Sequence, residues 1–187
     1  MRAIIVILGS LASLLAFAGS GPARGAAVEL RGNLGLEEAL AFDEFPLYDA
    51  GDRVDGLPLV AVLRRHDTAD FVSFVYGDCD AGDDAGCAPP AEVQVWPACR
   101  RNLGLYDSRL PGTPVPERVV VRGVPGAFLE DGTRLELQTG RSTVVLFGDS
   151  RAQVLRVVAA LRRLGGERTS EALPRAEPGA VDGTLRC

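Results

Sequence analysis

The chain has 187 residues, of which 47% are hydrophobic and 24% charged, and its formal net charge is -5. These proportions exclude a disordered tail, a multi-span membrane protein and a repeat protein, and the length predicts one domain. All 20 basic residues are arginine. Together with the abundant alanine, glycine and valine, this bias is typical of a bacterial genome rich in GC.

The N-terminal segment is apolar and uncharged over residues 3–18, directly after Arg2. This pattern predicts a signal peptide over residues 1–27, cleaved after Ala27, or an uncleaved membrane anchor. We therefore expect a protein that is secreted or held in the cell envelope, with residues 28–187 forming a single α+β domain. Contact with a membrane is expected only through the N-terminal segment, if that segment is retained.

Cleavage after residue 27 would leave 187 minus 27, or 160, residues, with 18 basic and 25 acidic positions and a net charge of -7. An acidic surface repels phosphate backbones. No arginine stripe interleaved with aromatic residues compensates for this charge, so we exclude nucleic acid as a partner.

The four cysteines form an even set, which in an exported chain predicts two disulfides. Three connectivities are possible, and we favour Cys79–Cys87 and Cys99–Cys187 because the first pair flanks a loop and the second would tether the last residue. Zinc ligation needs tight pairs such as C-x-x-C, which are absent from the sequence. We expect no metal and no cofactor.

The first half of the chain predicts short elements. Asn33 is a candidate helix cap, and the alternation of Val93 and Val95 with Glu92 and Gln94 predicts a half-buried strand. The expected elements are a helix over 34–41, a hairpin of strands 57–63 and 71–76, a strand over 92–96 and a helical turn over 98–105.

After an extended proline-rich connection over 110–116, the sequence predicts a meander. Its strands are expected over 118–121, 127–129, 134–138 and 143–147. Asp131-Gly132 predicts a two-residue hairpin turn, since both positions of the favoured turn need positive φ. The last strand is apolar on both faces, so we expect it in the centre of the sheet.

A long amphipathic helix is predicted next. Ser150 is its expected cap with Gln153 at capping-box spacing, apolar side chains recur at helical intervals as far as Leu164, and Gly165-Gly166 ends it. The fold class is therefore α+β, with this helix packed on a mixed, mostly antiparallel sheet. We expect an irregular tail over 167–187 whose end is drawn back onto the body.

The segment 144–150, VVLFGDS, resembles the first block of the GDSL or SGNH hydrolases. This resemblance implies Ser150 as a nucleophile activated by a downstream histidine. No histidine follows Ser150, and the one histidine, His66, lies far upstream. A serine hydrolase using Ser150 is therefore an alternative, and we expect Asp149 and Ser150 to cap the helix.

The loop 78–84 places four carboxylates in seven positions, which suggests a calcium-binding module as a second alternative. The spacing departs from an EF-hand, because Gly82 and Pro89 occupy positions five and twelve. We expect a solvated turn there instead.

The remaining candidates for a functional role are one histidine and four aromatic residues. We expect His66 to be exposed in a hairpin turn. The aromatic residues Tyr48, Tyr76, Trp96 and Tyr106 are candidates for a ligand groove, although core packing is the simpler interpretation. The sequence thus predicts a non-catalytic binding or interaction domain of the envelope or the exterior, whose partner is an unknown protein or small-molecule ligand.

Overall fold

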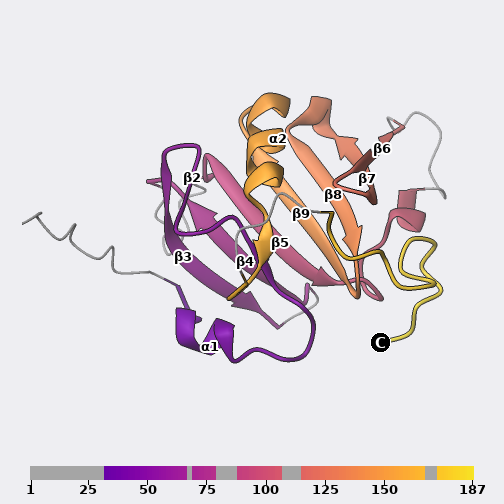
Figure 1. Cartoon of the computed structure of the whole chain (residues 1–187), viewed down its shortest axis with the longest axis horizontal. Helices are drawn as coiled ribbons and strands as arrows, with labels where there is room; N and C mark the ends of the chain where they lie inside the picture. Colours follow the sequence, from indigo (N-terminus) through magenta and orange to yellow (C-terminus); the bar gives the residue numbers. More distant parts are fainter. Residues whose placement is uncertain (1–31, 67–68, 79–87, 107–114, 167–171) are drawn as a thin grey trace, which may run out of the picture.

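An antiparallel sheet of eight strands organises the molecule (Figure 1). The computed structural model describes residues 32–66, 69–78, 88–106, 115–166 and 172–187. From one edge to the other the strands are β2 (Arg53–Val54), β3 (Leu57–Arg65), β4 (Phe71–Tyr76), β5 (Ala91–Pro97), β9 (Ser142–Gly148), β8 (Arg134–Thr139), β7 (Val124–Leu129) and β6 (Glu117–Val121).

The expected hairpin and meander are both confirmed. Strands β3 and β4 pair directly, and β6, β7, β8 and β9 follow one another across the sheet. Strand β9 lies between β5 and β8 and is therefore central, as its apolar faces predict. Every pair between the described strands is antiparallel, so the expectation of a mixed sheet is not met there. The reason is that short turns join most neighbours and β9 enters beside β5 in the opposite direction.

One face of the sheet carries the hydrophobic core. Helix α2 (Arg151–Ala160) contacts β8 and β9, and it buries Val154, Val157 and Val158 against them. The short helix α1 (Leu36–Leu40) and the ribbon of β1 (Tyr48–Asp49) with β10 (Arg162–Arg163) extend the same layer. The α+β class is thus confirmed in its coarse form, as a mostly antiparallel sheet with a helix packed on it.

The prediction of a long helix is wrong, because α2 has only 10 residues. Leu161 adopts an extended conformation and is wholly buried. The guanidinium of Arg122 donates to the carbonyls of Val158 and Leu161, which ends the helical hydrogen-bond ladder. The chain then pairs with β1, and Leu164 N–H donates to Leu47 O at 2.9 Å. Leu164 packs on the core from this ribbon rather than from a last helical turn.

Helix α1 is also shorter than the expected 34–41. Gly35, not Asn33, is its N-cap. The side chain of Asn33 instead forms two hydrogen bonds with the backbone of Arg64 in β3, at 2.7 and 2.9 Å. Asparagine side chains can hydrogen-bond to backbone groups, which makes them good helix caps, and Asn33 uses this capacity to fix the chain just before α1 to β3.

The opposite face of the sheet carries polar as well as apolar side chains. Alternation in β5 directs Val93 and Val95 to the core, and it directs Glu92, Gln94 and Trp96 to the other side. These three side chains are linked by hydrogen bonds of 2.9 and 3.2 Å. The half-buried strand expected over 92–96 is confirmed.

The C-terminal tail is held on the body by a disulfide between Cys99 and Cys187. Its described part, residues 172–187, contains no helix or strand. Cys79 and Cys87 lie outside the described residues, so one of the two expected disulfides is seen. No helix in the described part of the chain is long and apolar enough to cross a membrane.

Candidate functional site

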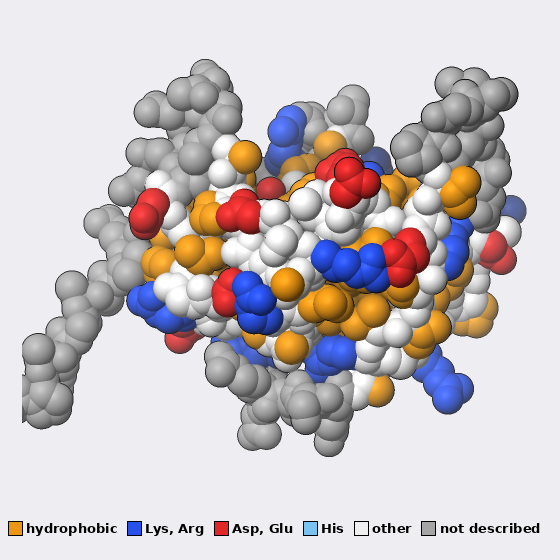
Figure 2. Space-filling model, turned by 90° about the horizontal axis from the view of Figure 1, so that it is seen from above, with side chains coloured by type: hydrophobic (Ala, Val, Ile, Leu, Met, Phe, Trp, Pro, Cys, Tyr) orange, Lys and Arg blue, Asp and Glu red, His pale blue; other side chains and the backbone are white. Residues whose placement is uncertain are grey.

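A cavity of about 570 Å³ lies where the beginning of β6, the end of β7 and the first turn of α2 meet. Figure 2 views the molecule from above Figure 1, and acidic and basic side chains lie next to one another over hydrophobic atoms on this side. The cavity is lined by Tyr106, Val115, Pro116, Glu117, Phe128, Leu129, Glu130, Asp131, Gly132, Arg134 and Arg151.

An unusual turn shapes one wall. Leu129 of β7 pairs with Arg134 of β8, and the residues between them form the single 3-10 turn η2 (Glu130–Gly132) and Thr133. Glu130, Asp131 and Gly132 have φ values of 50°, 54° and 92°. Positive φ at Asp131-Gly132 is confirmed, but the connection has four residues rather than two. The Asp-Gly pair predicts left-handed backbone and does not fix the length of the turn.

The first turn of α2 packs tightly against this wall. A Cβ atom added to Gly132 would lie 2.9 Å from Cβ of Arg151. Such a separation is too short for carbon atoms, so the site needs glycine for space as well as for its φ of 92°. Gly132 thereby determines how closely Arg151 approaches the cavity.

Arg151 covers an aromatic floor. Its guanidinium carbon lies 3.9 Å from the centre of the Phe128 ring, which is buried. The same guanidinium donates two hydrogen bonds to the carboxylate of Glu117 in β6, one of them at 2.7 Å. These hydrogen bonds lower the pKa of Glu117. The cavity therefore has an apolar floor beneath an ion pair that joins helix and sheet.

A buried carboxylate lies beside the cavity. Glu136 of β8 is wholly buried, and it accepts hydrogen bonds from both Nε and Nη2 of Arg101 and from the hydroxyl of Tyr106. Arg134 Nε lies 3.5 Å from the same carboxylate. The guanidinium of Arg101 also covers the ring of Trp96 at 4.9 Å. Pairing with a bidentate arginine makes it possible to bury this charge.

Tyr106 and Arg134 connect this cluster to the cavity, since both side chains also line it. Burial raises the pKa of Tyr106, and the hydrogen bond to Glu136 raises it further. The tyrosine thus remains a neutral donor to the carboxylate at physiological pH.

The mouth of the cavity is acidic. Arg134 Nη1 pairs with Glu130 at 2.6 Å, and Glu117 pairs with Arg151 as described above. Asp131 is exposed and has no ion-pair partner among the described residues. Three carboxylates thus surround the opening with two arginines, which leaves one negative charge uncompensated.

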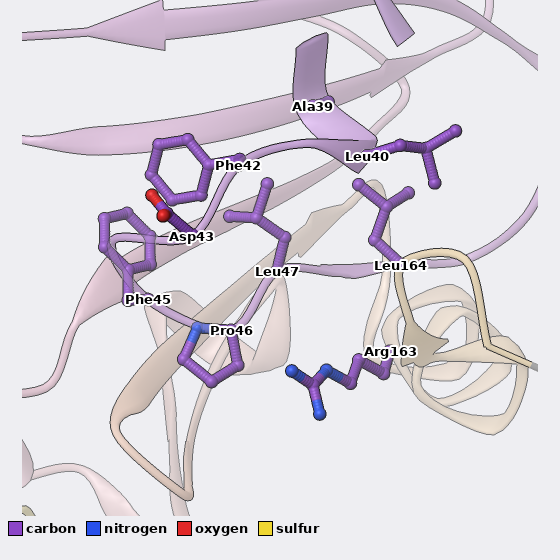
Figure 3. Close-up of a pocket in the computed structure, with 9 residues that line it drawn as sticks. All are labelled: Ala39, Leu40, Phe42, Asp43, Phe45, Pro46, Leu47, Arg163 and Leu164. Carbon is purple, nitrogen blue, oxygen red and sulfur yellow. The ribbon is translucent and has the colours of Figure 1, made fainter. Parts of the chain in front are cut away.

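Two smaller cavities lie elsewhere. One of about 170 Å³ is bounded by residues 39–47 on one side and by Arg163 and Leu164 on the other (Figure 3). The other, of about 190 Å³, adjoins the disulfide Cys99–Cys187. Ligand sites commonly have volumes of about 300 to 1,000 Å³, and of these three cavities between described residues the one beside β6 lies in this range.

Ser150 caps helix α2 as the sequence predicts. Its Oγ accepts a hydrogen bond from Gln153 N–H at 3.3 Å, and Gln153 Oε1 accepts one from Asp149 N–H at 2.7 Å. The reciprocal bond of the capping box thus reaches the residue before the cap. Both Asp149 and Ser150 are exposed.

His66 lies far from Ser150. The register aligns Gly148 with Ala91, Ala91 with Tyr76 and Tyr76 with Leu59, so Ser150 lies near the beginning of β3. His66 follows the end of β3, which is about 20 Å away at ~3.3 Å per residue. His66 is exposed in the hairpin turn, as expected, and accepts a hydrogen bond from Arg64 Nε at 3.2 Å. The fold therefore does not bring the one histidine to the serine.

The acidic loop falls mostly outside the described residues, which include only Asp78 of its four carboxylates. Within the described ranges, no three His, Cys, Asp or Glu side chains lie close enough together to hold a metal ion.

The four aromatic candidates lie in three different places. Tyr48 and Tyr76 are buried in the core, and the Tyr76 hydroxyl accepts a hydrogen bond from Ala50 N–H at 2.8 Å. Trp96 stacks on Phe71 with ring centres 4.4 Å apart. Of the four, only Tyr106 lines the large cavity.

Sequence reasoning did not identify the other residues of the site. Glu136 alternates with Leu135 and Leu137, a pattern that normally places an acid in solvent. The arginine that pairs with it, Arg101, is 35 positions away in the sequence. The local indications were the Asp131-Gly132 turn and Tyr106, a candidate for a ligand groove. No protein-family model, curated protein or solved structure matches this chain.

Proposed function

We propose that this protein is an exported, non-catalytic binding domain and that the cavity beside β6 is its binding site. The observation that carries the proposal is the cavity itself, which combines about 570 Å³ of space with an apolar floor and a few convergent charged groups. Phe128 and Leu129 supply the apolar surface, and Arg151, Arg134 and Asp131 supply the charges.

Binding is favoured over catalysis because the ionisable side chains at the cavity are mostly committed to one another. Glu117 pairs with Arg151, Glu130 with Arg134, and Tyr106 with Glu136. A general base needs an unshared lone pair within reach of the proton that it abstracts. The arrangement therefore supports recognition of a ligand more directly than a reaction.

Export remains part of the proposal. The apolar segment 3–18 and the four cysteines motivate it, and the disulfide Cys99–Cys187 is compatible with an oxidising compartment. Mass spectrometry of the protein recovered from its native host tests this part. A new N-terminus near residue 28 in the medium or the envelope fraction is expected, and the intact chain in the cytosol would contradict it.

A photocrosslinking amino acid tests the binding site. It is introduced at Val115, which lines the cavity and is 86% exposed, and at Leu155, an exposed position of α2 that serves as the matched control. Both proteins are produced in the native host and irradiated in place. We expect a discrete adduct from position 115 that is absent from position 155.

The same adduct from both positions, or none from position 115, would contradict the proposed site. A further check uses a fluorophosphonate, which labels activated serines. Labelling of the purified protein that disappears in Ser150→Ala would show a catalytic function instead.

A further inference from the structure

Strand β6 ends the sheet, and it pairs only with β7 among the described strands. The opposite edge is formed by β2, which has only two residues. An edge strand presents main-chain donors and acceptors that a further strand can use. The main-chain N–H and C=O groups of β6 that point away from β7 could therefore pair with a further strand.

The type of turn between β6 and β7 determines which main-chain groups of β6 point outward. Its two residues, Arg122 and Gly123, have φ values of 49° and 79°, and two positive values are characteristic of a type I′ hairpin. In such a hairpin the flanking pair, Val121 and Val124, exchanges hydrogen bonds, and so does every second pair from there. Val120 falls on a pair without such bonds, so its N–H and C=O point away from β7.

A further observation supports this assignment. The residue opposite Val120 is Pro125, which has no N–H to donate. After the end of the strand, Arg122 O is already used, because it accepts a hydrogen bond from Leu173 N–H at 2.9 Å. Val120 itself has no hydrogen bond from its outer side within the described part of the chain.

Exposed apolar side chains gather along the same edge. Val120 is 75% exposed, Val115 before the strand is 86% exposed, and Leu105 in the 3-10 turn η1 (Leu103–Tyr106) is 59% exposed. Arg118 of β6 donates to Leu103 O at 3.0 Å, which places η1 beside this strand. Natural proteins usually protect such an edge with charges or prolines, so an exposed valine there favours a docking function.

Charge indicates the kind of partner. The cavity at the beginning of β6 has one uncompensated carboxylate, Asp131, and the whole chain carries a net charge of -5. An acidic mouth beside the apolar side chains of Val115 and Leu129, which line the cavity, suits a long basic side chain. Its aliphatic stem would lie against these side chains while its charge remains at the opening.

We propose that β6 accepts an extended, basic peptide segment of a partner protein as a ninth, antiparallel strand, and that one basic side chain of this segment enters the cavity. The proposal rests on the function proposed above and specifies its partner. One residue of the peptide exchanges both main-chain hydrogen bonds with Val120. In an antiparallel register the third residue after it lies opposite Glu117, and it therefore shares the face of the cavity.

The probe is the synthetic peptide acetyl-Thr-Val-Thr-Val-Lys-Thr-amide, with the valine at its second position intended to pair with Val120. Three matched peptides accompany it: one N-methylated at that valine, one with glutamate for lysine, and one with norleucine for lysine. Affinity is measured by calorimetric titration of the oxidised protein at low ionic strength.

We expect the N-methylated peptide to bind about tenfold more weakly, because one main-chain hydrogen bond is lost and the added methyl group keeps the strands apart. The glutamate peptide should be weakened by at least a similar factor. Asp131→Asn keeps a residue type that tolerates positive φ and should weaken the lysine peptide about threefold to tenfold while leaving the norleucine peptide unchanged.

Val120→Pro removes the outward N–H, which would donate to the carbonyl of the peptide valine, without disturbing the pairing with β7, and it should weaken the plain peptide by about tenfold. Leu155→Thr is the control for loss of an exposed apolar side chain away from the edge. If Val120→Pro does not fold, the N-methylated peptide still tests the other bond of the same pair, from the peptide N–H to Val120 C=O, on the unaltered protein.

Equal affinity for the plain and N-methylated peptides would overturn strand addition, and equal affinity for the lysine and glutamate peptides would overturn the basic partner. If no peptide binds while the crosslink from position 115 is obtained, this inference fails and the proposed binding site stands. If the crosslink is also absent, both fail.

Discussion

The buried pair of Glu136 and Arg101 gives the most quantitative prediction. Replacing Arg101 with methionine leaves the wholly buried carboxylate of Glu136 with only Tyr106 and the more distant Arg134. Breaking a buried ion pair by removing one partner costs about 3 to 5 kcal/mol. Because Arg134 lies 3.5 Å away and the side chain of Arg101 is 22% exposed, we expect about 3 kcal/mol, at the lower end of that range.

The double variant Arg101→Met with Glu136→Gln tests whether the loss of stability comes from the unpaired buried charge. Glutamine keeps an acceptor for Tyr106 and removes the buried charge, so the double variant should lose only about 1 to 2 kcal/mol. It should therefore be more stable than the single variant Arg101→Met. Additive losses, with the double variant the least stable, would refute the reasoning.

Urea unfolding followed by circular dichroism measures these free energies. The denaturant dependence should remain unchanged between variants, so that the midpoint reports stability alone. Arg100→Met is the matched control, since Arg100 is adjacent, 53% exposed and 3.7 Å from Asp70. It should change stability by less than about 1 kcal/mol. An equal loss from Arg100→Met and Arg101→Met would also contradict the account.

Three further predictions concern the stability of the elements around the site. Replacing Cys99 with serine opens a loop of 88 residues and should lower the free energy of unfolding by roughly 4.5 kcal/mol in urea; a loss below about 1 kcal/mol would show that the tail needs no tether. Ser150→Ala removes the cap of α2 and should cost about 1 kcal/mol by the same measurement, whereas no loss would remove the cap assignment. Tyr76→Phe leaves the N–H of Ala50 without its acceptor and should cost about 1 to 3 kcal/mol. Burial, with a smaller contribution from a nearby carboxylate, raises the pKa of Tyr76 above its ordinary value of 10.0, so the unfolded chain loses this proton first. The stability that the native protein gains from Tyr76 should therefore be complete below pH 10 and fall as the pH rises further, and thermal melting of Tyr76→Phe should lack this part of the decline.

Much of the sheet could be predicted from the sequence because its strands have strong local patterns. The strand expected over 71–76 has these bounds in the structure, and alternation in β5 correctly assigned Val93 and Val95 to the core. The cap at Ser150 was predicted for the same reason, since it depends on residues only three positions apart.

The errors arose where distant residues compete with local preference. The apolar spacing predicted a helix continuing to Leu164, but pairing of β10 with β1 and the hydrogen bonds from Arg122 end it at Ala160. These partners are far away in the chain, so no local pattern reports them. Periodicity assigns a face to Leu164 but does not distinguish a helix from a short ribbon.

Most residues of the candidate site could not be predicted from the sequence. Each of its wall residues has an ordinary local explanation, such as an acid on a strand or an arginine at the start of a helix. Only the fold brings Glu117 to Arg151 and Arg101 to Glu136, across 34 and 35 positions. The GDS segment, in contrast, resembled a catalytic motif locally, and the sheet register separates Ser150 from His66.

Amide hydrogen exchange of the free protein, read by nuclear magnetic resonance at three consecutive residues of β6, tests the docking edge most directly. Val119 and Val121 point their N–H groups toward β7 and should exchange slowly. Val120 points its N–H outward and should exchange at least about a hundredfold faster than either neighbour, then become protected when the lysine peptide is added. Slow exchange at Val120 in the free protein would mean that the edge is already paired, and the account of a docking strand would be wrong.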